Sequence, residues 1–439
     1  MAREKLASRM GFILLSAGCA IGIGNVWKFP YLVGKNGGGA FVLLYLFFLA
    51  ILGIPIVTME FAIGRASQKS PSRMYHQLQP HTKRWRWHGY VAMAGNYLLM
   101  MFYTTVAGWM LQYFIKTAKG DFAGADNQQI ANIFAQMQSD TVSGVIFMAI
   151  VVVLGFVVCS FSLQNSVERV SKWMMLALLG IMIALAINSI FINDGVQGLE
   201  FYLRPDLNRM KGAGITTVIT NAMSQSFFTL SIGIGGMAVF GSYIGRDRAL
   251  LGEAINVALL DTFVALCSGL IIFPACFAYG VDVTAGPPLI FITLPNVFNN
   301  MQGGVIWGSL FFLFLSFAAF TTVIGVFENI LACTMDITNW SRKKSSLVNC
   351  PIMLLLSAPC AMHPNVLDAE DFILSKLILP IGALVFVIFC VNKKYGWGFD
   401  NFIKEANTGK GVKIPKALRL YLTYILPCVI LAIFIFGLL

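Results

Sequence analysis

Eleven apolar segments follow one another along the chain, separated by shorter polar stretches. Most are close to the roughly 20 residues that an α-helix needs to cross about 30 Å of hydrocarbon. The pattern therefore predicts eleven transmembrane helices. Their approximate limits are 10–32, 40–64, 89–116, 141–160, 167–193, 214–244, 252–280, 304–337, 348–362, 367–392 and 417–438. The eighth segment is long enough to extend beyond the bilayer at about 1.5 Å per residue, and the ninth is short and bounded by prolines.

The composition supports this interpretation. The 439 residues are 57% apolar and 12% charged, and the mean hydropathy is +0.75. Soluble domains have about 25% charged residues. These figures exclude a soluble enzyme, a disordered protein and a disulfide scaffold, and they indicate a multi-span membrane protein.

The net charge of +11 is concentrated in alternate loops. Lysine and arginine gather in residues 65–88, 338–347 and 393–416, on the same predicted side as Arg3, Lys5 and Arg9, whereas the opposite loops are richer in aspartate and glutamate. The positive-inside rule then places the N-terminus in the cytoplasm and, after eleven spans, the C-terminus outside. The charge is thus mainly an orientation signal in the plasma membrane, and we expect no nucleic-acid partner.

Cysteine and histidine give no sign of a metal centre or a structural disulfide. The nine cysteines lie within or at the ends of the predicted spans, where a free thiol behaves as a small hydrophobe, and there is no CxxC motif. The four histidines lie in loops or at span ends, which favours structural or interfacial roles. The apolar run after Arg9 is too long for a cleavable signal peptide.

Two predicted spans, the first and the sixth, carry polar residues and glycines at their centres. The first contains Gly18, Gly22, Gly24 and Asn25, and the sixth contains Gln225, Thr229, Ser231, Gly233 and Gly235. Close packing of helices through small residues would explain the glycines. The polar side chains, however, need partners inside the hydrocarbon. The combination favours helices that unwind to form a site.

The spacing of these two spans predicts an internal repeat. They are five spans apart, and because five is odd, a repeat of five would be inverted in the membrane. Inverted repeats with broken helices are typical of secondary transporters. We expect one transporter domain over 1–439, with repeats at 10–193 and 214–392 and a separate last helix at 417–438. Freed N–H groups suit a carboxylate, and freed carbonyls suit a cation.

Asp261 lies in the middle of the seventh span. A carboxylate at this depth is costly and by default functional. The alternative is an uncharged structural hub that only makes hydrogen bonds.

Several motifs, in the right order and on the right spans, resemble those of the neurotransmitter:sodium symporters. They are the stretch from Gly22 to Tyr31, the Asn36–Phe41 stretch, Gly53-Ile-Pro55 with Glu60 and Gly64-Arg65, and the stretch from Gln225 to Ser231. The resemblance runs from about residue 2 to 438, and eleven spans are typical of bacterial members. It implies an all-α membrane protein with a five-plus-five inverted repeat, helices 1 and 6 unwound at mid-membrane, and sodium-coupled uptake of amino acids by alternating access.

The resemblance implies two sodium sites. The first would use Ala20, Asn25, Thr229 and Asp261, and the second Gly18, Ile21, Ala318, Thr321 and Thr322. All the ligand atoms are oxygens, as a hard cation requires. The two threonines alone would be a weak signal, because a helical threonine often bonds its own preceding carbonyl.

The resemblance also predicts that transport does not require chloride. In animal relatives the position of Asp261 is usually asparagine, and a nearby chloride ion supplies the negative charge. Tyr45, Gln225 and Thr229 match that chloride pocket, but Asp261 brings its own charge.

For the substrate, the resemblance implies a pocket of eleven residues: Ala20, Gly22, Gly24, Leu99, Tyr103, Phe228, Thr229, Ser231, Ile234, Thr322 and Val326. The carboxylate would meet the N–H groups of Gly22 and Gly24 and the Tyr103 hydroxyl. The ammonium would meet the carbonyls of Ala20, Phe228 and Thr229, and Ser231. Some members have a bulky phenylalanine where this chain has Ile234, so we expect large hydrophobic or aromatic amino acids such as tyrosine.

Two ion pairs match the family's gates. Lys28 and Asp371 match the outer gate, with a lysine where arginine is usual and hence without its bidentate fork. Arg3 and Asp336 match the inner gate. Its supporting residues would be Glu168, Ser242, Tyr243 and Glu328. Alternatively, both are surface pairs that contribute little. The fifth span lacks the helix-breaking proline of many relatives, so a route that unwinds it has no support here.

Two other classes of function compete with a transporter: an intramembrane enzyme, and a sensor or channel on the same fold. An intramembrane enzyme would need paired aspartates, a Ser/His pair or HExxH, and the sequence has none, so we expect no enzyme. An amino-acid sensor or an uncoupled, channel-like protein on the same fold stays open. Uptake against a gradient would distinguish a transporter from both.

Overall fold

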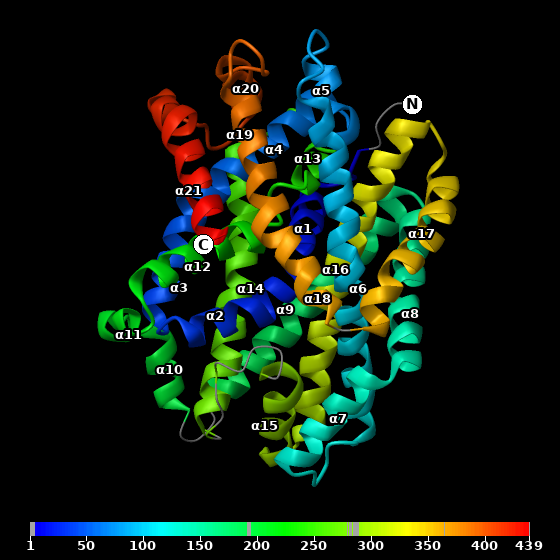
Figure 1. Ribbon diagram of the computed structural model, residues 1–439, viewed down its shortest axis with the longest axis vertical. Helices are drawn as coiled ribbons and strands as arrows, with labels where there is room; N and C mark the ends of the chain where they lie inside the picture. The colour runs from blue at the N-terminus through cyan, green and yellow to red at the C-terminus, as the bar shows by residue number, and fades with distance from the viewer. Residues whose placement is uncertain are drawn as a thin grey trace.

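The computed structural model describes residues 5–190, 195–278, 280, 283, 289–363 and 365–438, and they form helices joined by turns and loops (Figure 1). Within these ranges the only extended pairing is an isolated bridge between Arg248 and Lys410. The predicted all-helical architecture is confirmed.

Among the described residues, nine helices are long and apolar enough to cross a membrane. They are α3–α4 (Gly39–Ser67), α6 (Arg86–Lys119), α8 (Thr141–Ser160), α9 with its first turn (Ser166–Ile190), α14 (Leu250–Ala278), α16 (Gly304–Thr338), α17 (Arg342–Met362), α18–α19 (Val366–Val391) and the run to α21 (Lys416–Gly437). The first predicted span is a bent pair, α1 (Arg9–Ala20) and Gly24–Lys35, with an angle of 57° between its parts. The sixth is α12 (Ile215–Thr229) followed by α13 (Gly236–Gly241).

The structure corrects one predicted boundary clearly. The ninth span was expected over 348–362, but α17 is 21 residues long and begins at Arg342. Ser341 caps it by accepting a hydrogen bond from the Lys344 N–H, so the basic cluster expected in a loop forms the first helical turn. The long eighth span is confirmed, because the 35 residues of α16 extend over about 50 Å.

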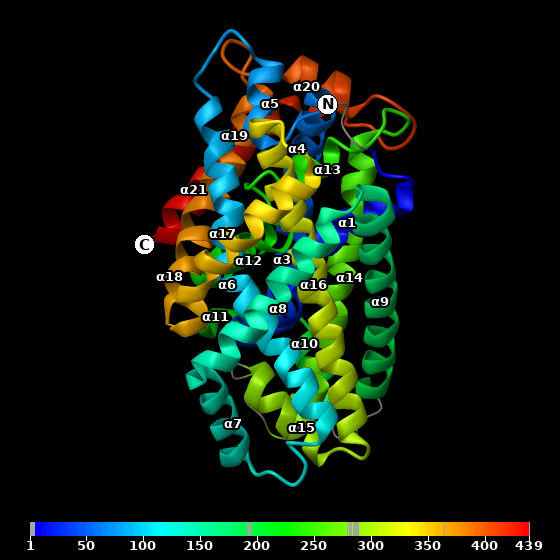
Figure 2. The same ribbon diagram turned by 90° about the vertical axis from the view of Figure 1, so that its right-hand side faces the viewer.

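Several predicted loops contain short helices. These are α5 (Pro71–Leu78), α7 (Asn127–Ser139), α10 (Val196–Leu203), α11 (Leu207–Gly212), α15 (Leu294–Asn300) and α20 (Phe399–Ala406). In both views α5 and α20, which belong to two of the basic loops, lie at one end of the molecule, while α7 and α15 lie at the other (Figure 2). The charge separation along the sequence is therefore a separation in space.

The helices that carry the site lie at the centre. α1 packs against α16, α14 and α9, and α16 packs along α6. Glycines permit these approaches: a methyl group on Gly325 of α16 would lie 2.7 Å from Cβ of Cys19 in α1. The broken first span is thus held between long continuous helices.

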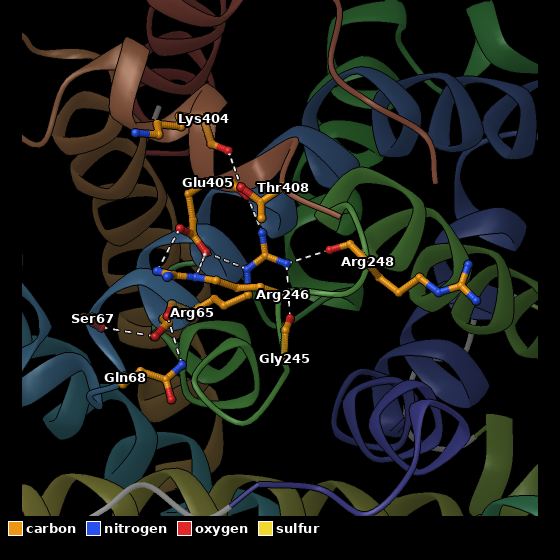
Figure 3. Close-up of polar contacts among 10 residues, drawn as sticks. Arg65, Ser67, Gln68, Gly245, Arg246, Arg248, Lys404, Glu405 and Thr408 are labelled. Atoms are coloured by element: carbon orange, nitrogen blue, oxygen red, sulfur yellow. Dashed lines mark hydrogen bonds and ion pairs between the residues drawn. The ribbon is translucent and has the colours of Figure 1, made fainter. Parts of the chain in front are cut away.

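A fully buried arginine fastens α20 to the end of α4 (Figure 3). Arg65 Nε donates to Glu405 Oε1 at 2.7 Å, and its Nη1 donates to the carbonyl of Arg248 at 2.6 Å. Arg246 also pairs with Glu405, at 3.2 Å. Three segments far apart in sequence therefore meet on one guanidinium group.

We expect Arg65→Ala to lower the free energy of unfolding by about 3 kcal/mol, because removing one member of a buried ion pair leaves its partners without compensation. Arg209→Ala is the matched control. Its pair with Asp206 is exposed, at 3.4 Å, and such pairs contribute at most about 1 kcal/mol. Thermal melting of the purified protein in detergent measures both, and equal melting temperatures for the two variants would contradict the structural role of Arg65.

Candidate functional site

The first span is interrupted directly after Ala20. Ile21 adopts an extended conformation with ψ of 106°, and the chain resumes as a π-helical turn over Gly24–Lys28. Backbone groups near this break lack their regular α-helical partners. Carbonyls at the end of α1 and N–H groups of the next segment bond to side chains instead.

The sixth span is interrupted between Thr229 and Gly236. Gly233 and Gly235 have φ of 103° and 72°, a backbone region that glycine adopts without strain. Ser231 also has a positive φ, 49°, which is uncommon for a residue with a side chain. The N–H of Gly233 donates to Glu60 Oε1 at 2.8 Å, so a buried carboxylate of α4 fixes the irregular segment.

Asp261 of α14 joins the two breaks. Its Oδ1 accepts a hydrogen bond from Asn25 Nδ2 at 2.8 Å, and its Oδ2 accepts one from the Thr229 hydroxyl at 2.8 Å. All three side chains are fully buried. One carboxylate thus connects the residue after the first break with the residue before the second, and it brings together three of the four predicted ligands of the first sodium site.

A second oxygen cluster lies where α16 faces the end of α1. Thr322 Oγ1 is 3.0 Å from the Ile21 carbonyl oxygen and 3.3 Å from those of Gly18 and Ala318. Thr321 Oγ1 donates to the Ala318 carbonyl at 2.9 Å. The structure therefore brings together all five residues that the resemblance assigned to the second sodium site.

A small cavity of about 20 Å³ lies among the two breaks, α6 and the tenth span. Nine of the eleven predicted substrate residues line it: Ala20, Gly22, Gly24, Leu99, Tyr103, Phe228, Ser231, Ile234 and Thr322. Thr229 and Val326 are not part of its lining, since Thr229 faces Asp261. Leu374 and Leu379 of the tenth span complete the wall. The sequence does not mark either leucine, because both lie in a continuously apolar segment with no period that distinguishes one face.

Tyr103 lies beside the first break. Its hydroxyl accepts a hydrogen bond from the Ile23 N–H at 3.1 Å. The N–H of Gly22, one of the two expected to receive a carboxylate, donates to Asn25 Oδ1 at 3.3 Å. Donors from the break and a tyrosine hydroxyl therefore converge at one wall of the cavity.

A larger cavity of about 220 Å³ lies next to the first and shares Tyr103 and Phe228 with it. Lys28 and Asp371, the predicted outer gate, line it and form an ion pair at 3.4 Å. The Lys28 Nζ also lies 3.8 Å from the centre of the Phe228 ring. The pair is about one-third exposed. Tyr103 and Phe228 line both cavities, whereas Lys28 and Asp371 line only the larger one.

Of the predicted inner gate, only Asp336 lies within the described residues, because Arg3 is outside them. Asp336 accepts a hydrogen bond from the Ser70 N–H at 2.7 Å and pairs with Lys69 at 3.4 Å. The sequence does not mark Lys69 as the partner of Asp336, because Lys69 is one of six cations in its loop.

The four expected supporting residues lie near this end in two groups. Tyr243 donates to Glu328 at 2.5 Å, and Arg342 pairs with the same carboxylate. The Ser242 hydroxyl donates to the Val239 carbonyl. Glu168 accepts hydrogen bonds from the Ala7 N–H at 2.7 Å and from the Ser8 hydroxyl at 2.9 Å. Ala7 and Ser8 tie the start of the chain to the beginning of the fifth span, where residues Leu163–Glu168 are π-helical without a proline.

The residues that match a chloride pocket also lie close to Asp261. The Tyr45 hydroxyl is 3.4 Å from Thr229 Oγ1, and Gln225 Nε2 donates to the Gly24 carbonyl at 3.0 Å. Among the described residues no three His, Cys, Asp or Glu side chains form a transition-metal cluster. Carbonyl, amide and hydroxyl oxygens with one carboxylate suit a hard monovalent cation instead.

The fold and the site define a class of protein: a multi-pass membrane protein whose ligand cavity lies between two broken helices, as in secondary transporters. A family model described as "Sodium:neurotransmitter symporter family" matches residues 3–141 and 128–439. The chain belongs to this family of sodium-coupled transporters and is not an enzyme.

Individual relatives agree with this assignment. The chain is 33% identical to an uncharacterized sodium-dependent transporter of Bacillus subtilis, YhdH, over 87% of this chain and 86% of the relative. It is 26% identical to the sodium-dependent serotonin transporter of Drosophila melanogaster, over 99% of this chain and 76% of the relative. The crystal structure of MhsT in complex with L-phenylalanine matches with a TM-score of 0.88 and 34% identity, covering 99% of this chain and all of that one.

The geometry predicts that the glycine at the first break tolerates no side chain. A methyl group on Gly22 would lie 2.2 Å from the Tyr103 hydroxyl and 2.6 Å from Thr322 Oγ1, so Gly22→Ala should destabilise the protein by about 1–3 kcal/mol through overpacking. Gly180→Ala is the control, because nothing lies within 4 Å of its added methyl, and a helical alanine should stabilise by up to about 1 kcal/mol. Opposite shifts in melting temperature are expected; shifts of the same sign and size would contradict the close approach.

Proposed function

We propose that this protein carries out sodium-coupled, chloride-independent uptake of large hydrophobic or aromatic amino acids, such as tyrosine, by alternating access. The observation that carries the proposal is the buried Asp261 carboxylate between Asn25 and Thr229, next to a cavity between two helix breaks. A carboxylate at this depth needs a compensating cation or proton, and a transported sodium ion would supply that charge.

Two sodium ions are proposed. The first would bind Asp261, Asn25, Thr229 and the Ala20 carbonyl, beside the carboxylate of the substrate. The second would bind the carbonyls of Gly18, Ile21 and Ala318 with the hydroxyls of Thr321 and Thr322. The short distances between Thr322 and these carbonyls support this site, because a sodium ion needs several oxygens that already converge.

Chloride independence rests on charge. One negative charge beside the first sodium ion balances it, and Asp261 supplies that charge from the protein itself. The Tyr45 hydroxyl and Thr229, which match a chloride pocket, are already connected to this carboxylate. A chloride ion at the same place would add a second negative charge at short range in a region of low dielectric constant, which is unfavourable.

The substrate class rests on the lining of the cavity. Leu99, Ile234, Leu374 and Leu379 provide an apolar wall, and the polar contacts lie together at the helix breaks. Ligand pockets of this kind hold an apolar body and orient it through a few polar groups. The MhsT complex with L-phenylalanine supports an aromatic amino acid for this chain.

The proposed transport cycle uses the two ends of the site. Lys28 and Asp371 would form the outer gate, and Arg3 with Asp336 the inner gate, within eleven spans arranged as repeats at 10–193 and 214–392. The N-terminus would face the cytoplasm, because α5 and α20 carry basic loops at the same end. The first and sixth spans would be unwound at mid-membrane.

The energetics suffice for accumulation. Each charge that moves inward contributes about 2.3 kcal/mol per 100 mV, and a tenfold sodium gradient adds about 1.4 kcal/mol per ion. Two ions with a net-neutral substrate would supply on the order of 7 kcal/mol, or roughly five decades of concentration. A sensor or a channel would not use this energy.

Uptake of labelled tyrosine into proteoliposomes tests the function. We expect accumulation above the external concentration that requires an inward sodium gradient and is the same in chloride and in gluconate. Equilibration without accumulation would favour an uncoupled, channel-like protein, and sodium-dependent binding without uptake would favour a sensor.

Asp261→Asn should make uptake dependent on chloride or abolish sodium coupling, because the variant lacks the negative charge beside the first ion. Asp121→Asn is the control, since this carboxylate is about 41% exposed and pairs only loosely, at 4.0 Å, with Lys116. Normal uptake by Asp261→Asn in gluconate would refute the role of Asp261 while leaving sodium coupling as such untouched.

Ile234→Phe should narrow the cavity. We expect the apparent affinity for tyrosine and tryptophan to fall by about 5-fold to about 140-fold relative to that for alanine, because overpacking costs about 1–3 kcal/mol and 1.4 kcal/mol is a factor of ten. Ile234 already packs against Gly95 of α6, where an added methyl would lie 2.8 Å away. Ile183→Phe, on an exposed face of α9, should change nothing, and an unchanged preference in Ile234→Phe would contradict the assigned pocket.

A further inference from the structure

A large groove of about 790 Å³ lies away from the proposed transport site, where the end of α19 (Leu379–Val391) faces α20 and the first turns of the last span. Its lining joins two chemistries. Lys393, Lys394 and Arg419 contribute cations, and Ile388, Val391 and Pro427 contribute apolar surface. No residue of the small cavity or of the two oxygen clusters takes part in it.

The charge of the groove is unbalanced. One carboxylate, that of Asp400 on α20, pairs with Arg419 at 3.6 Å, and both side chains are exposed. Lys393 and Lys394 are also exposed, and Lys394 Nζ lies 5.1 Å from the centre of the Tyr395 ring. The positive charges therefore exceed the negative ones.

The apolar side of the groove faces outward from the helix bundle. Leu420 and Tyr424, which line it, are each 65% exposed, and the last span is the least covered of the nine candidate spans, with 22% of its most apolar window buried. Exposed tyrosines are typical of the boundary between lipid and water. The groove therefore lies where the acyl chains of a lipid and its headgroup meet.

The backbone of the last span is irregular at this groove. Residues Tyr421–Ile425 form a π-helical turn, a feature frequent at functional sites. Thr423, in this turn, lines the groove, and its buried hydroxyl has no hydrogen-bond partner within the described residues. Rotation about one side-chain bond would turn this hydroxyl toward a ligand with a polar linkage.

The far wall of the groove is held in place before any ligand arrives. Phe399 at the start of α20 forms this wall, and Glu405 in the same helix is fastened to the buried Arg65 (Figure 3). Arg419 also lies over the Phe399 ring, 5.1 Å from its centre. This wall of the groove is therefore ordered without a ligand.

We propose that this groove binds an anionic phospholipid, with the phosphate between Lys393, Lys394 and Arg419 and an acyl chain along Val391, Leu420 and Pro427. Basic pockets between transmembrane helices on the cytoplasmic side recognise anionic headgroups. The apolar wall distinguishes a lipid from a soluble phosphate, because a soluble anion would use only the cations.

Displacement of a fluorescent phosphatidylglycerol from the full-length protein in detergent tests the proposal. Unlabelled phosphatidylglycerol should displace it, whereas phosphatidylcholine and glycerol 3-phosphate at equal concentration should not. Equal displacement by phosphatidylcholine would show that the groove does not recognise the net negative charge of the lipid headgroup. Equal displacement by glycerol 3-phosphate would show that the groove binds a soluble anion only. Either result overturns the proposal.

Variants locate the site. Lys393→Gln with Lys394→Gln should weaken binding by about 25-fold, at about fivefold for each cation removed. The matched control is Lys343→Gln with Lys344→Gln, another lysine pair, in the first turn of α17 and outside the groove; it should change affinity less than twofold. Asp400→Asn should tighten binding, since it removes the competing carboxylate. Equal loss in both lysine pairs would indicate general surface attraction. No gain in Asp400→Asn would show that this carboxylate does not compete for Arg419. Either result would overturn the assignment.

Discussion

The structure depends on one constraint: polar groups inside a membrane-spanning bundle must find partners within the protein. Two helices are interrupted, and each interruption leaves backbone groups without their regular bonds. Asp261 meets this constraint for the polar side chains at both breaks, because its two carboxylate oxygens accept hydrogen bonds from the Asn25 amide and the Thr229 hydroxyl. Glu60 does the same for the irregular segment around Gly233. The same groups that stabilise the breaks are therefore the groups that are suited to hold ions.

Close packing makes this arrangement possible. The broken spans need continuous neighbours, and α6, α14 and α16 supply them. Small residues allow the approach: a methyl group on Gly233 would lie 2.2 Å from the Leu379 carbonyl oxygen. The tenth span therefore contacts the second break directly, which is why Leu374 and Leu379 reach the cavity. Movement of the irregular segment would have to move this wall as well.

At the basic end of the molecule, a buried ion pair and buried hydrogen bonds join segments that are far apart in sequence. At the basic end, Arg65 is wholly buried and links α4, α20 and the segment around Arg248. Glu328 is shared there by Tyr243 and Arg342. These contacts join segments that are far apart in sequence, and they lie at the end where the proposed inner gate would open. The groove beside α20 uses exposed cations of the same end, whose attraction for anions depends on their position at the membrane surface.

The sequence by itself determined the all-helical membrane class and the approximate limits of the nine helices that are long and apolar enough to span a membrane in the described residues. It also marked the polar and glycine-rich centres of the first and sixth predicted segments. It succeeded because hydrophobic length and the cost of buried polar groups are local properties that each segment displays. It failed where position depends on distant partners. Arg342, in the first turn of α17, pairs with the buried Glu328, and Lys69 pairs with Asp336 from a loop with several equivalent cations. No local sequence pattern distinguishes Leu374 and Leu379 from the other apolar residues of their segment. Only the tertiary structure decided which leucine faces the cavity and which cation meets which carboxylate, because these choices follow from how the helices pack and not from the composition of any one of them.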